Sequence, residues 1–206
     1  IVLRSLETGE VLQFDSLDEI TFDEKELNVM KAVVKHFGNT GIEIITHTDA
    51  PLESGLGGSA SHAVSLIKAF CRYNNVEMSK EDIAKLAYHI ERNVLGIEGG
   101  HQDQWAAAFG GFNYIHFEKD STNSEYPMNV TMNPLNLSEK DFQTFENSLL
   151  LIRIPREKSG REVHLEQRSR SEESLAILKM KFDNIDAMRH YIESGKFERM
   201  GELLHL

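Results

Sequence analysis

The spacing of apolar residues in the first fifty positions predicts two strands, a helix and a third strand. Short apolar stretches within residues 1–14 flank the turn Glu7-Thr8-Gly9-Glu10, which is typical of a strand pair. Apolar residues then recur at helical intervals from Asp23 to His36, before Gly38. The β-branched run from Gly41 to His47 predicts a strand that leads into a loop.

The next sixty residues predict three helices. A helix that follows Gly58 has a wide apolar face and few charges, so we expect it to be mostly buried in the core. Ser79-Lys80-Glu81-Asp82 fits a capping box and opens a helix that should end near Gly96. A short Ala-rich helix is expected over Gln102–Phe109.

The remainder of the chain interleaves further strands with helices. The alternation predicts strands over 112–117, 126–132 and 148–154, a helix capped by Ser138, a charged helix from Glu162 to about Tyr191, and a last helix beyond Gly195. Such mixing indicates an α+β or mixed α/β fold.

Composition and net charge limit the classes of binding partner that we expect for this chain. The chain has 206 residues and a net charge of −11, which argues against a broad face for nucleic acid. No apolar run is long enough to span a membrane. Residues 1–10 show no basic stretch followed by an apolar one, so we expect no targeting signal there. Cys71, the single cysteine, lacks an internal disulfide partner; we expect it in the core and the protein in the cytoplasm.

The segment from Pro51 to Ser61 is the most informative one, since three glycines join a strand to the start of a buried helix. Glycine lets backbone N–H groups approach a ligand closely, and a helix N-terminus adds unpaired N–H donors and partial positive charge. Together they predict a site for nucleotide phosphates. The hydroxyls of Ser59 and Ser61 could contact a phosphate oxygen or magnesium.

The residues of this loop also fit other motifs, to different degrees. It could be a plain turn with Ser59 or Ser61 as N-cap. A Walker A loop is excluded because no Lys follows the glycines. Gly55-x-Gly57-x-x-Ala60 satisfies the relaxed dinucleotide fingerprint, but it begins too far beyond the strand.

Two acidic residues downstream suit phosphoryl transfer. Glu91 ends a predicted helix and Asp103 follows a Gly-Gly loop, twelve residues later. Phosphoryl transfer needs a metal on the nucleotide phosphates and a residue that orients or deprotonates the attacking hydroxyl. On the residues alone, each acid could instead be a solvated residue at a helix end or an N-cap.

Pro51-x-x-x-Gly55-Leu56-Gly57-Gly58-Ser59-Ala60-Ser61 resembles the second motif of the GHMP kinase superfamily, with Gly58 and Ser61 as departures. The resemblance implies a two-lobe fold, with a ribosomal-protein-like N-terminal lobe over 1–125 and a ferredoxin-like C-terminal lobe over 126–206, truncated at both ends. It implies ATP and Mg²⁺ as cofactors, Ser59 and Glu91 as metal ligands, and Asp103 as the catalytic residue that deprotonates or orients the acceptor hydroxyl. The residues that it assigns to the nucleotide are Pro51, Gly55, Leu56, Gly57, Gly58, Ser59, Ala60 and Ser61.

The stretch Gly99-Gly100-His101-Gln102-Asp103-Gln104 resembles heptose 7-phosphate kinases, and less specifically the kinase part of fucose-salvage enzymes. The implied acceptor is a small sugar or sugar phosphate. Residues expected near it are Gly100, His101, Gln102, Arg156 and Arg161, although the two arginines could belong to a solvated helix start. A silent sugar and nucleotide sensor and a homodimer both remain open.

Overall fold

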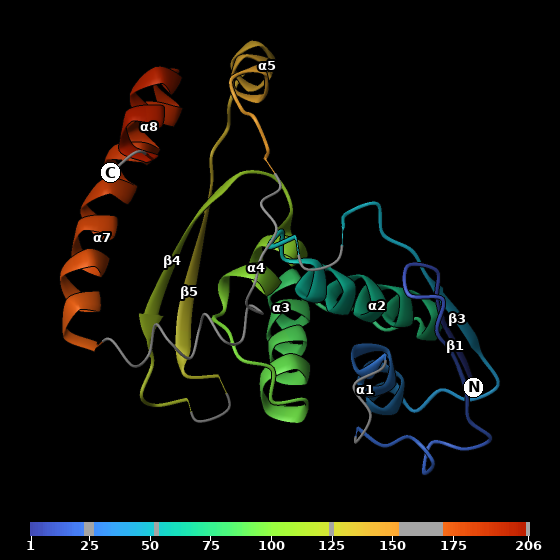
Figure 1. The fold of residues 1–206 in the computed structure, drawn as a ribbon. Coiled ribbons are helices and arrows are strands. Elements are labelled where there is room, and N and C mark those ends of the chain that lie inside the picture. Colours follow the sequence, from blue (N-terminus) through green and yellow to red (C-terminus); the bar gives the residue numbers. More distant parts are fainter. Residues whose placement is uncertain (23–26, 52–53, 124–125, 153–170, 205–206) are drawn as a thin grey trace. The chain divides into compact units, whose positions relative to one another are not determined.

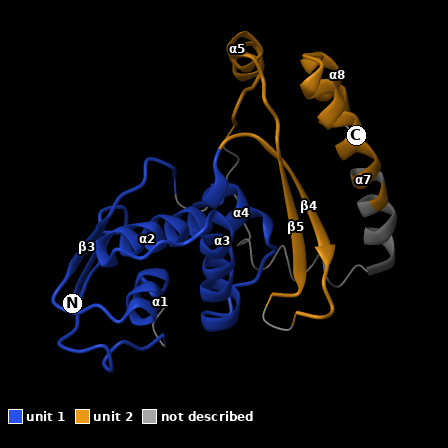
Figure 2. Ribbon diagram, turned by 180° about the vertical axis from the view of Figure 1, so that it is seen from behind, with its two compact units in different colours: residues 1–110 blue, residues 111–206 orange. Residues whose placement is uncertain are grey.

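The computed structural model describes residues 1–22, 27–51, 54–123, 126–152 and 171–204 (Figure 1). The chain forms two compact units, Ile1–Gly110 and Gly111–Leu206 (Figure 2). The units divide earlier than the lobe boundary expected at 125/126, because the strand after Gly111 pairs with the next strand in a hairpin of the second unit. The boundary between the two family lobes stays a prediction.

The first unit contains a small mixed sheet. Strands β1 (Val2–Ser5), β2 (Val11–Gln13) and β3 (Glu43–Thr46) lie in the order β2-β1-β3. β1 pairs antiparallel with β2 and parallel with β3. Parallel neighbours need a crossover connection, and helix α1 (Asn28–Phe37) lies in it. The three predicted strands are thereby confirmed.

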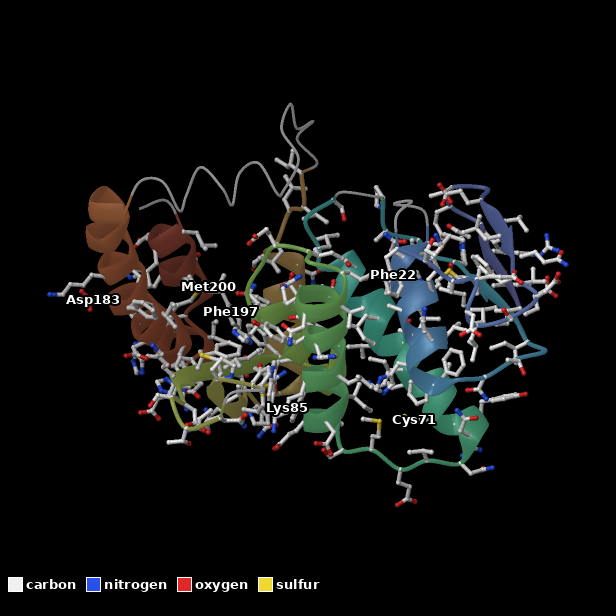
Figure 3. The ribbon with its side chains drawn as sticks, turned by 90° about the horizontal axis from the view of Figure 1, so that it is seen from below. Phe22, Cys71, Lys85, Asp183, Phe197 and Met200 are labelled. Carbon is white, nitrogen blue, oxygen red and sulfur yellow. The ribbon has the colours of Figure 1, made fainter. Side chains whose placement is uncertain are left out.

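Helix α2 (Gly58–Asn74) is the centre of the first unit, as its apolar face predicted. It packs against α1, α3 (Lys80–Tyr88) and α4 (Gln102–Phe109). Cys71, labelled in Figure 3, is buried on α2, and burial raises the pKa of its thiol. Fully buried side chains of the first unit include Leu3, Met30, Val33, Ile67, Ile90 and Trp105.

The predicted helix from Ser79 to Gly96 is present but changes its winding. The Ser79 hydroxyl accepts a hydrogen bond from the Asp82 N–H at 3.0 Å, which confirms the cap. After α3 the chain continues as a π-helical turn, η1 (His89–Val94). Apolar periodicity did not reveal this turn, and π-helical turns are often found at functional sites.

The second unit is built on a hairpin of β4 (Asn113–Lys119) and β5 (Met128–Pro134), with helices α5 (Glu139–Asn147), α7 (Ser171–Glu193) and α8 (Phe197–Leu204). Ser138 caps α5 as predicted. A small core joins Leu135, Ile192 and Met200, with Phe197 also buried on α8 (Figure 3). Within the described residues, no helix has the length and apolar composition that a membrane crossing requires.

One predicted strand is wrong over the part that the structure describes. Residues 148–152 of the expected strand 148–154 form no strand, and Leu150 and Leu151 are 82% and 79% exposed. The N–H of Ser148 instead donates to the Thr144 carbonyl at 3.2 Å, which prolongs the end of α5. An apolar run becomes a strand only where a neighbouring strand pairs with it. Residues 153 and 154 lie outside the described residues.

Candidate active site

The glycine-rich loop ends in an open helix N-terminus. Gly55 and Gly57 have φ angles of 77° and 70°, a region that L side chains rarely adopt. Gly57 is the N-cap of α2 and offers no side chain to the N–H groups of the first turn. Those donors and the positive end of the helix dipole therefore remain suited to an anion.

Most residues predicted to hold the nucleotide lie on the surface of this loop. The exposed members are Pro51, Gly55, Leu56, Gly58, Ser59 and Ser61, whereas Gly57 is half-buried. Ala60 is different, since it is 2% exposed and packs into the core. Only its backbone N–H could therefore face a phosphate group.

Glu91 is a buried carboxylate held by two side-chain donors. It is 1% exposed and lies in η1. The Ser59 hydroxyl donates to its Oε1 at 2.5 Å, and the Gln104 amide nitrogen donates to its Oε2. A buried charge is tolerated only when hydrogen bonds replace its lost water. The structure thus brings together the two side chains that the sequence predicted as metal ligands.

Asp103 lies beside the glycine-rich loop. It is exposed in the first turn of α4, and a Cβ placed on Gly57 would be 3.5 Å from its Cγ. The carboxylate therefore lies close to the N-terminus of α2 as well as that of α4, where both helix dipoles favour negative charge. Two segments that are far apart in the sequence meet here.

Gln104 is the residue that the sequence interpretation missed. Its side chain is fully buried, and its amide donor contacts Glu91. The adjacent Asp103 faces the Gly57 side of the site, so α4 contributes to both parts of the arrangement. The Gln was visible in the Gly-Gly-x-Gln-Asp-Gln stretch, but nothing in the linear sequence indicated its partner.

The residues expected near the acceptor are only partly covered. Gly100 and Gln102 are exposed, and His101 is half-buried. The His101 ring stacks on Tyr88 with centroids 4.1 Å apart. Burial lowers the pKa of His101, and the charge of Arg92 lowers it further. The two predicted arginines, Arg156 and Arg161, lie outside the described residues.

The oxygen donors at Ser59 and Glu91 fit magnesium. A hydroxyl and a carboxylate are hard ligands, and Mg²⁺ typically takes one or two protein groups together with water and phosphate oxygens. Across the described part of the chain, no group of three or more His, Cys, Asp or Glu side chains could hold a metal. The donor set therefore suits a metal shared with a phosphate ligand better than a structural metal site.

Replacing Gly57 and Gly58 by Ala should have opposite effects on stability. Gly57→Ala places a Cβ at a φ of 70°, so we expect a loss of about 1 kcal/mol in the free energy of unfolding. Gly58→Ala meets no atom within 4 Å at the first position of α2 and should gain about 0.5 kcal/mol. Denaturant unfolding of the intact protein measures both, and equal effects would contradict the assigned backbone.

Acidification should destabilise the fold through His62. The Nε2 atom of His62 is buried without a hydrogen-bond partner among the described residues. Burial lowers the pKa of His62 from 6.5, whereas the charges of Glu7 and Glu91 act in the opposite direction. A lowered pKa in the folded state means that the unfolded state takes up the proton first. The free energy of unfolding should therefore fall as pH decreases below about 6.5.

Denaturant unfolding at a series of pH values checks this expectation. His36 and His101 also have lowered pKa values, so they contribute to the slope in the same direction. His62→Gln should reduce the slope of the free energy of unfolding against pH, because a glutamine side chain binds no proton in this pH range. An unchanged slope in the variant would rule out His62 as a contributor.

Comparison with known proteins shows which protein family the chain resembles. Residues 25–111 match the family described as GHMP kinases N terminal domain. This range includes the glycine-rich loop, Glu91 and Asp103. Residues 25–111 therefore contain a GHMP kinase N-terminal domain, as the motifs predicted.

Two of the individual relatives are a sugar-phosphate kinase and a sugar kinase. The chain is 33% identical to D-glycero-alpha-D-manno-heptose 7-phosphate kinase of Campylobacter jejuni, over 99% of this chain and 60% of the relative. It is 27% identical to galactokinase of Clostridium perfringens, over 86% of this chain and 45% of the relative. The chain thus spans about 60% or less of the length of these relatives.

Solved structures share the fold. The crystal structure of a D-glycero-D-manno-heptose 1-phosphate kinase from Bacteroides thetaiotaomicron superposes with a TM-score of 0.79 and 24% identity. The match covers 98% of this chain and 60% of that one. This likeness confirms the predicted mixed α/β fold of the GHMP kinases.

Proposed function

We propose that the intact protein is an ATP-dependent sugar kinase whose acceptor is the anomeric hydroxyl of D-glycero-D-manno-heptose 7-phosphate. The observation that carries the proposal is the meeting of three groups in the first unit. The glycine-rich N-terminus of α2 lies beside Asp103, and Ser59 of the same helix contacts Glu91. Anion-binding backbone, metal-type oxygens and an acidic group are the parts that phosphoryl transfer requires.

In this proposal the triphosphate of ATP rests on the loop from Gly55 to Ser61 and on the first turn of α2. The N–H groups and the dipole of α2 balance the negative charge of the phosphate groups without having to reorganise during the reaction. Ser59 and Glu91 would hold magnesium, which would supply positive charge to offset the negative charge of the phosphate groups. The Gln104 amide keeps the Glu91 carboxylate oriented from the other side.

Asp103 acts on the acceptor. Its carboxylate orients the sugar hydroxyl and takes its proton as the oxygen attacks the γ-phosphorus atom. A bond forms between that oxygen and phosphorus, the bond from phosphorus to the β,γ-bridging oxygen breaks, and ADP leaves with the electron pair. Exposure of Asp103 leaves room for the substrate.

The choice of a heptose phosphate rests on the relatives. Identity to the heptose 7-phosphate kinase extends over nearly the whole chain, whereas identity to galactokinase is lower. Transfer to fucose or another sugar is the alternative within the same mechanism. A cytoplasmic location, a homodimer and the absence of a nucleic-acid partner stay predictions from the sequence.

Mass spectrometry of reaction products tests the proposal. The intact protein is incubated with MgATP and a panel of heptose 7-phosphate, fucose, galactose, homoserine and mevalonate. One added phosphoryl group on the heptose alone is the expected result. Transfer to another acceptor would show that the assigned substrate is wrong, although the assigned reaction would stand. Binding of nucleotide with transfer to none would favour a silent sensor and contradict the kinase proposal.

A further inference from the structure

The loop between η1 and α4 is organised by one guanidinium group. Arg92, the residue after Glu91, donates from Nη1 to the Ile97 carbonyl and from Nη2 to the Gly100 carbonyl, both at 3.1 Å. These two bonds span the connection that leads from Glu91 to Asp103. A planar fork of donors suits such a two-point contact, whereas a lysine ammonium is a compact point charge.

The backbone at Gly99 is built around the same group. Gly99 has a φ of 155°, and a Cβ there would lie 2.5 Å from the Arg92 Nη2 atom. No real Cβ makes so close a contact with a fixed neighbour. Gly99 therefore leaves room for Arg92, and a larger residue would displace the guanidinium from the loop.

Arg92 also reaches the far end of the loop through an aromatic stack. Its guanidinium carbon lies 6.0 Å from the centroid of the Tyr88 ring, within the range of a cation–π contact. Tyr88 in turn stacks on His101, and the two rings are nearly parallel at 7°. One side chain is thus connected to the loop at both carbonyls and to the residue directly before α4.

We propose that Arg92 is a positioning residue, which fixes the loop from Ile97 to His101 and thereby sets the place of the acceptor sugar relative to Asp103. The inference rests on the proposed function, since it assumes that this loop faces the sugar. Glu91 and Arg92 are neighbours in the π-helical turn, so one turn of backbone supports both the proposed metal carboxylate and the acceptor loop.

Steady-state kinetics of the intact protein test the role in catalysis. Arg92→Met removes both donors while keeping an unbranched stem of similar reach. The KM for the acceptor should rise and kcat should fall, with kcat/KM for the acceptor lower by about a hundredfold. The KM for MgATP should stay unchanged, because the two Arg92 bonds go to the acceptor loop and not to the glycine-rich loop.

Two further variants separate geometry from charge and from general destabilisation. Arg92→Lys should not restore the acceptor KM, since one ammonium cannot reproduce the fork. Arg72→Met removes an exposed arginine from the last turn of α2 and should leave all constants unchanged. Three results would overturn the proposal. They are full activity of Arg92→Lys, equal increases in the acceptor KM and the MgATP KM of Arg92→Met, or an effect of Arg72→Met as large as that of Arg92→Met.

Gly99→Ala provides a test that does not need Arg92 to be replaced. The added methyl should displace the guanidinium and raise the acceptor KM in the same selective way. Its lowering of Tm should be smaller in an Arg92→Ala background, because the clash is then absent. Additive Tm changes would contradict the contact between Gly99 and Arg92.

A spectroscopic readout keeps this inference distinguishable from the kinase proposal. Histidine NMR should show a higher pKa for His101 in Arg92→Met than in the unchanged protein, since a nearby positive charge is lost. An unchanged pKa would contradict the assigned contacts even if activity falls. If the unchanged protein transfers phosphate to no acceptor, the proposed function fails, while the Tm cycle and the NMR titration still test the contacts of Arg92.

Discussion

Asp103→Asn in the intact protein is expected to lower kcat about a thousandfold, because an amide cannot accept the proton of the attacking hydroxyl. Asn has nearly the same shape as Asp, and the Asp103 side chain is exposed, so the fold should tolerate the change. MgATP affinity should remain within a few-fold of its original value, since the phosphates are held by the loop and by α2. Product formation and nucleotide titration measure the two effects separately.

Asp183→Asn is a matched control for this prediction. Asp183 is exposed on α7 in the second unit, and Figure 3 labels it there. The same chemical change at that position should leave kcat unaffected. Undiminished turnover of Asp103→Asn would show that Asp103 neither takes the proton nor orients the hydroxyl, and the catalytic assignment would be wrong.

Glu91→Gln should reduce both stability and magnesium-dependent activity. In the folded protein the Glu91 carboxylate is 1% exposed and accepts from Ser59 and from Gln104. An amide can accept through one oxygen only, and its NH₂ group would face a donor. We expect a loss of about 1–3 kcal/mol in the free energy of unfolding, the usual cost of a buried polar group without its partner.

The metal role of Glu91 is read from the magnesium dependence. In Glu91→Gln the concentration of Mg²⁺ that gives half-maximal activity should rise, because a carboxylate ligand has been replaced by a neutral one. The exposed Glu77 supplies the matched control, and Glu77→Gln should change neither quantity. A destabilised variant with an unchanged Mg²⁺ requirement would leave Glu91 a structural residue and remove it from the proposed metal site.

Asp103 also distinguishes a kinase from a silent relative that binds nucleotide without transfer. A sensor that binds nucleotide without transfer would still need the open N-terminus of α2, but it would not need Asp103 beside Gly57. If the protein is a sensor, Asp103→Asn should leave nucleotide affinity unchanged and there is no turnover to lose. If the protein is a kinase, the same variant should lower kcat while MgATP affinity stays nearly unchanged. The same variant therefore discriminates between the two functions.

The sequence by itself determined the family, the local elements and the residue types of the site. Glycines at positions that need positive φ, a serine followed by an acid at a helix start and an Ala-rich segment each act over a few residues. For that reason the glycine-rich loop, α2, α3 and α4 were predicted close to their observed bounds. The motifs around Ser59, Glu91 and Asp103 identified the chemistry, because phosphoryl transfer restricts which side chains are useful.

Only the tertiary structure decided which of those groups meet. Three contacts depend on how η1 and α4 turn back toward α2. They are the hydrogen bond from Gln104 to Glu91, the approach of Asp103 to Gly57, and the hydrogen bond from Arg92 to the Gly100 carbonyl. Tertiary structure also decided that the expected strand 148–154 does not form over its described residues. The apolar run from Leu149 to Ile152 stays exposed, because no neighbouring strand pairs with it. Local preferences specify how a segment folds, whereas contacts between distant segments depend on packing energies that no short window of sequence contains.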